Sequence, residues 1–258
     1  MLPKFYLKRE QTTTLYAKEV TSPYIEFHFH SHIELLAVLE GQIEVTVNDR
    51  QQLLQPGQIA VALSHDAHQF RSPTPSRAIS IVIPTDMCAE FISAIGDRKT
   101  MSPFLTNEAL FQTVCDCFSK MEASTNTICQ KGHLYVLLGT LLACMQLEQR
   151  QDLPDPQLYS HLLQYINNHY TQDISLRTIS TALGYNPSYL SRIFNNSFYT
   201  SIPKYITLLR LRHAVLMMQD PKKSITDCAY ESGFHSLRTF YRVFQEEFHC
   251  SPREYRNK

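Results

Sequence analysis

The sequence predicts an α+β protein of two domains, a β-barrel or sandwich with appended helices followed by an all-α domain. Residues 5–83 hold short β-branched and aromatic stretches between turn signals, spaced about 8–12 residues apart as in sandwiches and barrels. Beyond residue 157 the apolar residues follow a helical period, and one helical pattern occurs twice. The proline-containing stretch between these parts has the composition of a linker. We therefore place a first domain at 1–150, a linker at 151–157 and a second domain at 158–258.

The charges of the chain are unevenly distributed, although its formal net charge is zero. Residues 1–157 contain 12 Lys and Arg against 17 Asp and Glu, whereas residues 158–258 contain 12 against 7. A basic second domain suits a polyanionic partner, and the alternative is charge scatter between two unrelated halves. The seven cysteines form no C-x-x-C pair, which is typical of a reducing compartment. Without a long apolar run, we expect a cytoplasmic protein with no membrane partner.

Several polar residues with regular spacing lie in the predicted β-region. His28, His30 and Glu34 precede Gly41 in the order H-x-H-x3-E-x6-G, and His68 follows eleven residues after Gly57. Residues i and i+2 of a strand point the same way, so the two histidines share a side, as Glu34 would on an unbroken strand. This spacing resembles the two motifs of cupin barrels, in which such residues line the barrel and in some members hold a metal. Both motifs depart from the pattern, because no glycine lies six residues before His28, and Leu63 and His65 stand at the Pro and Gly positions of the second motif.

Three interpretations of these four residues remain open. Histidine and carboxylate ligands suit several divalent ions, so a metal site is chemically feasible. We favour a ligand pocket without metal, lined by His28, His30, Glu34 and His68, and we expect no cofactor. The third interpretation is that the histidines satisfy buried polar groups. His32 has the same parity and supplies another imidazole.

Helical patterns follow Pro84 at residues 87–95, 108–121 and 133–149. The last of these is apolar on most sides over its middle, which predicts a helix buried all round. We expect it to pack on the barrel and against a second copy in a homodimer. Packing on the barrel alone is the alternative.

The C-terminal domain contains a helix, a glycine turn and a second helix in two copies. In residues 224–256, Ser224 and Ser236 are candidate N-caps, Gly233 marks the turn, and phenylalanines recur every four residues in the second helix. Residues 175–198 repeat this pattern 49–50 positions earlier. Residues 202–219 between the copies predict a rigid connecting helix with Lys204, Arg210 and Arg212 solvated. Two helix-turn-helix motifs at a fixed separation favour DNA reading in successive major grooves.

This domain is similar to the AraC family of bacterial transcription regulators. The matching marks are Leu190-Ser191-Arg192-Ile193-Phe194, Arg210-Leu211-x-x-Ala214, Ile225-x-Asp227-x-Ala229-x3-Gly233-Phe234, Phe240-x-Arg242-x-Phe244 and Ser251-Pro252-x-x-Tyr255-Arg256. The resemblance implies a regulator that binds promoter DNA under control of a small effector, frequently a sugar or related metabolite, and usually activates transcription. We expect double-stranded promoter DNA, that effector and RNA polymerase as partners. The chain departs from the pattern at Tyr199 and His249, where the family commonly has Gly, and at Ser180, whose hydroxyl is expected to bond the i−4 carbonyl.

The candidate DNA contacts lie on the second helix of each motif. Arg192 and Arg242 are expected to pair with guanine, and Asn195 with a base or phosphate, although phosphate contact without base reading is the alternative for each arginine. The expected contacts are Ser188, Ser191, Arg192 and Asn195 in the first motif, and Arg238, Thr239 and Arg242 in the second.

Two other functions compete with that of a ligand-responsive regulator, for which we expect no enzymatic activity. One is a metal-dependent cupin enzyme with a helical appendage, which rests on the spacing of the four barrel residues. The other is a constitutive DNA-binding protein whose barrel only dimerises.

Overall fold

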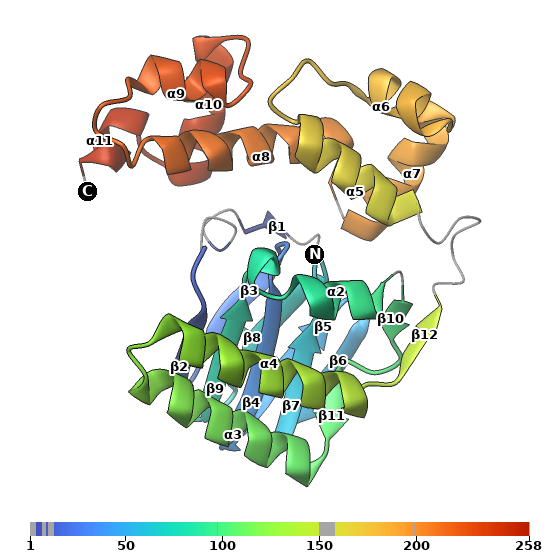
Figure 1. The fold of residues 1–258 in the computed structure, drawn as a ribbon, viewed down its shortest axis with the longest axis vertical. Coiled ribbons are helices and arrows are strands. Elements are labelled where there is room, and N and C mark those ends of the chain that lie inside the picture. The colour runs from blue at the N-terminus through green and yellow to red at the C-terminus, as the bar shows by residue number, and fades with distance from the viewer. Residues whose placement is uncertain are drawn as a thin grey trace. The chain divides into compact units, whose positions relative to one another are not determined.

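A computed structural model describes residues 4–6, 9, 13–96, 98–149, 158–198 and 200–257 (Figure 1). The chain divides into two compact units, Met1–Pro156 and Gln157–Lys258. The expected linker at 151–157 lies outside the described residues. No helix in the described part of the chain combines the length and the apolar character that a membrane crossing requires.

The first unit is built on two five-stranded sheets that face each other as a barrel. One sheet has the order β1 (Lys4–Phe5), β3 (Tyr24–Phe29), β8 (His68–Arg71), β5 (Ile43–Val47) and β6 (Arg50–Leu54). The other has the order β11 (Phe104–Thr106), β7 (Gln58–Ala62), β4 (Ile33–Glu40), β9 (Arg77–Ile83) and β2 (Tyr16–Thr21). Strands β5 and β6 form a hairpin, and Asn48, with a φ of 55°, lies in its turn.

Strand β4 explains how the two cores of this unit are separated. Leu36 and Val38 point between the sheets, whereas Leu35 and Ala37 face the helices on the other side. A strand buried on both faces reads as a continuous apolar run, which is why IELLAVLE shows no alternation. The barrel interior is therefore closed on this side by one strand layer.

Helices cover the outer face of the sheet that contains β4 (Figure 1). They are η1 (Thr85–Met87), α2 (Ala89–Ile95), α3 (Glu108–Ala123) and α4 (Thr127–Cys144), and a small sheet pairs β10 (Arg98–Thr100) with β12 (Leu147–Gln149). The helix expected at 133–149 was placed too late, because Asn126 caps α4 and residues 147–149 form a strand. Within one chain the helix is not buried all round, since Val136 is 58% exposed, and its packing against a second copy stays a prediction.

The second unit consists of helices alone among its described residues. These are α5 (Leu158–His169), α6 (Leu176–Leu183), α7 (Pro187–Phe198), α8 (Ile202–Met217), α9 (Ile225–Glu231), α10 (Leu237–Phe248) and α11 (Pro252–Arg256). Helices α6 and α7 form the first motif, α9 and α10 form the second, and α8 connects them (Figure 1). The fold class predicted from the sequence, a cupin-like barrel with appended helices and a tandem helix-turn-helix domain, is confirmed.

Candidate functional site

The four residues singled out in the barrel lie together in the structure. His28, His30, Glu34 and His68 are all buried, and their nearest potential ligand atoms lie within 4.8 Å of one another. Oε2 of Glu34 is 3.3 Å from Nε2 of His30 and 3.4 Å from Nε2 of His68. His32 is buried beside His30 but does not belong to this group. We call the four residues the histidine cluster.

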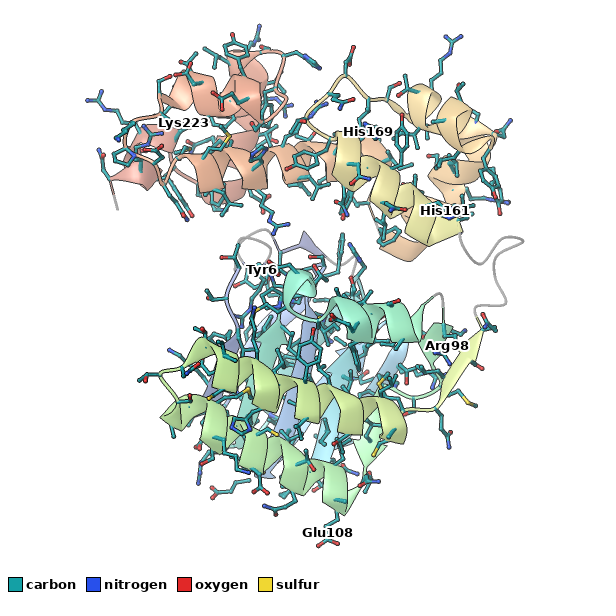
Figure 2. All side chains as sticks on the ribbon, viewed as in Figure 1. Tyr6, Arg98, Glu108, His161, His169 and Lys223 are labelled. Atoms are coloured by element: carbon teal, nitrogen blue, oxygen red, sulfur yellow. The ribbon has the colours of Figure 1, made fainter. Side chains whose placement is uncertain are left out.

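The cluster forms across the barrel and not along one strand. His28 and His68 are paired partners on β3 and β8, whereas Glu34 belongs to β4 in the facing sheet. His30 lies between β3 and β4, so the condition of an unbroken strand is not met. Tyr6, which follows β1 and is labelled in Figure 2, packs its ring edge-on against His28, with ring centroids 4.9 Å apart. His65 has a φ of 68° at the position where the cupin motif has glycine, so the backbone shape of that turn is kept.

Backbone contacts fix the orientation of two imidazoles. Nδ1 of His28 is 2.7 Å from the carbonyl oxygen of Glu26, and Nδ1 of His68 is 2.8 Å from that of Asp66. A carbonyl oxygen only accepts, so Nδ1 carries a proton in each ring and Nε2 faces the cluster. This carbonyl–imidazole arrangement is the one that orients metal-binding histidines.

Burial and neighbouring charge both act on the ionisation of the cluster. Burial, together with the nearby His68 and His30, lowers the pKa of His28 to about 3, so this imidazole is neutral at physiological pH. Burial raises the pKa of Glu34, but the contacts from His30 and His68 outweigh it and hold that pKa well below its ordinary value. The cluster therefore presents an ionised carboxylate beside a neutral imidazole.

This donor set fits a divalent transition ion. Nε2 of His28 and Oε1 of Glu34 are buried and have no hydrogen-bond partner among the described residues. Buried polar atoms without partners are uncommon, and a cation between them would satisfy both. Three imidazoles and one carboxylate are ligands that suit zinc, iron, nickel or copper. His28, His30, Glu34 and His68 are the residues that would hold the ion.

The cavity of the barrel lies beside the cluster and is lined by other residues. A space of about 410 Å³ is bounded by β2, β3 and their turn, with Leu36, Phe70 and Ser80 behind them. Phe70 follows His68 on the same face of β8, with ring centroids 5.7 Å apart. None of the four cluster residues is among the described residues that line this space. Sequence reasoning missed the lining because its members belong to no motif.

Both helix-turn-helix motifs have the turn that their glycines predicted. Gly184 has a φ of 75° and Gly233 a φ of 97°, values that side-chain-bearing residues rarely adopt. Ser175 and Ser224 cap the first helix of each motif through their side chains. Ser236 stands at the N-cap position of α10, as expected, but its side chain makes no capping bond. His249 takes the left-handed conformation that glycine would favour, with a φ of 54°, and Tyr199 lies outside the described residues.

The predicted DNA contacts lie on the open faces of α7 and α10. Buried phenylalanines anchor the opposite faces, including Phe194 and Phe240, which are fully buried. The predicted contacts Ser188, Arg192, Asn195, Arg238, Thr239 and Arg242 are exposed, and Ser191 is half-buried. Each helix therefore has one side fixed in the core and the other available to a partner.

Two contacts in this unit were not expected from the sequence. Nη1 of Arg242 donates to Oε1 of Glu246 at 2.7 Å, so this arginine has an exposed acidic partner one turn away. Arg210 is not simply solvated, because it donates to the carbonyl oxygens of Tyr170 and Gln172. The Glu246 contact has the i, i+4 spacing that signals such pairs, whereas no local spacing signals the contacts of Arg210.

Comparisons with known proteins agree with both parts of the structure. Residues 179–258 match the family described as helix-turn-helix domain, and residues 15–84 match the family described as cupin domain. The chain is 23% identical over 241 residues to the HTH-type transcriptional activator RhaS of Enterobacter sp. strain 638, covering 89% of this chain and 86% of RhaS. It is 24% identical over 232 residues to the uncharacterized regulator YobQ of Bacillus subtilis strain 168, covering 89% and 88%.

Other similarities are more limited in extent or identity. An uncharacterized HTH-type transcriptional regulator of Staphylococcus aureus strain MSSA476 is 30% identical over 106 residues, which are 41% of this chain and only 14% of that protein. Unsaturated fatty acid-bound ToxT from Vibrio cholerae strain SCE256 has a TM-score of 0.58 at 12% identity over 95% of each chain, which shows a shared fold. With both domains matched and two relatives aligned along most of its length, the chain belongs to the AraC family of transcription regulators and has a cupin domain before its helix-turn-helix domain.

Proposed function

We propose that this protein binds promoter DNA through α7 and α10 and regulates transcription in response to a small molecule bound in the barrel. The observation that carries the proposal is the pair of capped helix-turn-helix motifs with exposed polar faces. Arg192 and Asn195 would read bases in one major groove, with Ser188 and Ser191 as permissive contacts. Arg238, Thr239 and Arg242 would do so in the next. The basic balance of residues 158–258 supports attraction to the phosphate backbone.

Selection of bound duplexes from random DNA pools tests this function directly. The full chain is expected to enrich one sequence with two conserved segments about one helical turn apart. Arg242→Ala is then expected to weaken binding to that sequence by about 1–3 kcal/mol and to relax preference in one segment. Arg253→Ala removes an exposed arginine of α11, outside both recognition helices, and serves as the matched control. An equal loss on selected and random DNA would make Arg242 a phosphate contact.

Activation, a sugar or related effector, contact with RNA polymerase and a cytoplasmic location are parts of the same proposal. The relative RhaS is named a transcriptional activator, which supports activation here. The structure of ToxT with a bound unsaturated fatty acid is of a protein with this fold that binds a small molecule, which supports an effector here. A reporter gene behind the selected site measures the sign of regulation, because an activator raises and a repressor lowers its output.

We propose that α4 joins two copies of the chain. Ile128, Tyr135 and Val136 recur at i, i+7 and i+8, so these exposed apolar side chains share one face of the helix. Gly132 and Gly139 lie on the same face of the helix, and the space at their Cβ positions is open. A second helix could therefore approach closely there. Val136→Glu is expected to convert a dimer to monomers in sedimentation equilibrium. Monomeric wild-type chain at micromolar concentration would contradict the proposal.

The histidine cluster supports a second function, that of a metal-dependent cupin enzyme. The relatives found are transcription regulators, so this candidate rests on the donor geometry alone. Metal analysis of protein purified without chelator distinguishes the two. Stoichiometric metal together with turnover of a substrate would favour the enzyme, whereas metal without turnover would leave the regulator with a metal-bearing barrel.

A further inference from the structure

The cavity of the barrel has the size and floor of a small-molecule site. Its volume of about 410 Å³ falls in the range of ligand pockets in proteins. Val20, Ile25, Leu36 and Phe70 supply apolar surface, and all four belong to or pack against the core between the sheets. Leu36 and Phe70 are themselves almost fully buried in the barrel, so the back of the cavity is fixed in place before a ligand binds.

One residue in the wall of the cavity, Arg9, is positively charged and has a hydrogen-bond donor without an acceptor among the described residues. Arg9 lies over the ring of Tyr16, with its guanidinium carbon 4.5 Å from the ring centroid, and both residues line the space. Nε of Arg9 is buried and has no hydrogen-bond acceptor among the described residues. The ring fixes the position of the guanidinium without neutralising its charge. A buried donor left without an acceptor is costly, and an oxygen of a ligand would remove that cost.

The acidic residue in the wall does not serve as the partner of Arg9. Glu19 also lines the cavity, but its Oε1 accepts from Nε of Arg77 at 2.6 Å. Arg77 donates in turn to Glu40, so these exposed charges pair with one another. Arg9 is therefore a cation of the lining that makes no ion pair with a carboxylate of the described residues.

These features select one class of ligand. A guanidinium binds a carboxylate through two parallel hydrogen bonds. A doubly charged phosphate would find one cation in the described lining and the nearby Glu19, so a single negative charge suits this cavity better. We propose that the cavity binds a small monocarboxylic acid, with its carboxylate on Arg9. The role of this acid as the effector rests on the proposed regulatory function, whereas its binding does not.

Calorimetric titration of the full chain tests the binding without DNA. Hexanoate, octanoate and phenylacetate are the probes, each compared with its neutral primary amide. At least one acid is expected to bind roughly tenfold or more tightly than its amide, because hydrogen bonds to a charged group contribute about 1.5–3 kcal/mol. Arg9→Gln is expected to abolish that preference and leave the binding of the amide unchanged.

Lys18→Gln is the matched control for the lost charge. Nζ of Lys18 lies 5.9 Å from the centroid of the same Tyr16 ring, but Lys18 does not line the cavity. The Lys18→Gln variant should retain the preference for the acid over its amide. Val20→Phe, which fills the cavity, should weaken acid and amide alike.

The inference is overturned if no acid outbinds its amide, or if Arg9→Gln keeps the preference. A separate DNA-binding measurement distinguishes the two proposals. Acid binding that leaves DNA affinity unchanged would uphold the site and remove its role as effector site, whereas DNA binding without acid binding would remove this inference alone.

Discussion

Arg210 and Tyr170 are joined directly, although 40 positions separate them in the sequence. Nε of Arg210 on α8 donates to the carbonyl oxygen of Tyr170 at 2.6 Å, and Nη2 of the same guanidinium donates to that of Gln172 at 2.8 Å. Tyr170 and Gln172 follow α5 and precede the first motif, whereas α8 leads to the second. The turn at Gly233 approaches the same segment, because a Cβ there would lie 2.7 Å from the carbonyl oxygen of Thr171. Residues 170–172 therefore contact both the connecting helix and the second motif.

Arg210→Ala is expected to lower the free energy of unfolding of the second unit by about 1–3 kcal/mol, since two charge-assisted hydrogen bonds are lost. We also expect affinity for a DNA site with both segments to fall more than affinity for a single segment, because the motifs lose a common support. Urea unfolding and titration with both duplexes measure these effects. Lys204→Ala, at an exposed position of α8, is the control. Equal losses on both duplexes would contradict a positioning role.

The two turn glycines are expected to respond differently to alanine. Gly184→Ala introduces only the strain of a left-handed residue, about 1 kcal/mol, because a Cβ there meets nothing within 4 Å. Gly233→Ala adds a clash with Thr171 and is expected to cost about 1–3 kcal/mol more. The denaturation midpoints of the two variants check this prediction. Similar shifts of the midpoint would mean that the segment around Thr171 moves to accommodate the new Cβ.

Ser180→Ala is expected to stabilise the first motif. The Oγ of Ser180 is buried and has no hydrogen-bond partner among the described residues, so the expected bond to the i−4 carbonyl is not formed. Removing a buried hydroxyl that lacks a partner is expected to gain about 1 kcal/mol. Ala229 occupies the equivalent position of the second motif and is fully buried. The reverse change Ala229→Ser should lower the midpoint, and destabilisation by Ser180→Ala would show that the hydroxyl is satisfied.

In the presence of chelator, the barrel is expected to be less stable at pH 5 than at pH 7. The pKa of His28 is about 3 in the folded chain against 6.5 ordinarily, so the unfolded chain binds more protons as the pH falls below 6.5. The expected loss is about 2 kcal/mol between these pH values. Glu34, whose pKa is also lowered, adds a loss of the same sign below its ordinary pKa of 4.5. His28→Gln should flatten the pH profile, and His161→Gln, at an exposed position, should leave it unchanged.

Much of the fold could be predicted because local patterns encode it. The turn glycines, the buried phenylalanines and the serine caps each impose a backbone shape or a buried face within a few residues. The start of α4 was missed because residues 130–133, Gln-Lys-Gly-His, interrupt the apolar period soon after its cap, Asn126. The sequence grouped His28 with Glu34 because of their spacing. In the structure they lie together because the chain reverses between two sheets, which the alternation of side chains along one strand does not describe.

The remaining parts of the site depend on contacts between distant segments. Arg9 approaches Tyr16 and an apolar floor drawn from several strands, and no motif marks that meeting. The residues around Arg210 in the sequence are those of a solvent-exposed helix arginine. Its acceptors are backbone carbonyl oxygens, which every residue has and which therefore leave no mark in the sequence. Only the folded chain brings these groups together.

The two recognition helices are unlike, and α8 joins them in one chain. Helix α7 presents two serines, one arginine and an asparagine, whereas α10 presents two arginines, one of them paired with Glu246. A palindrome would offer the same half-site to both helices. Because the helices present different side chains, such a half-site could match at most one of them. The DNA element of this protein is therefore expected to have polarity, so that inverting it in a promoter would turn the bound protein to face upstream instead of downstream.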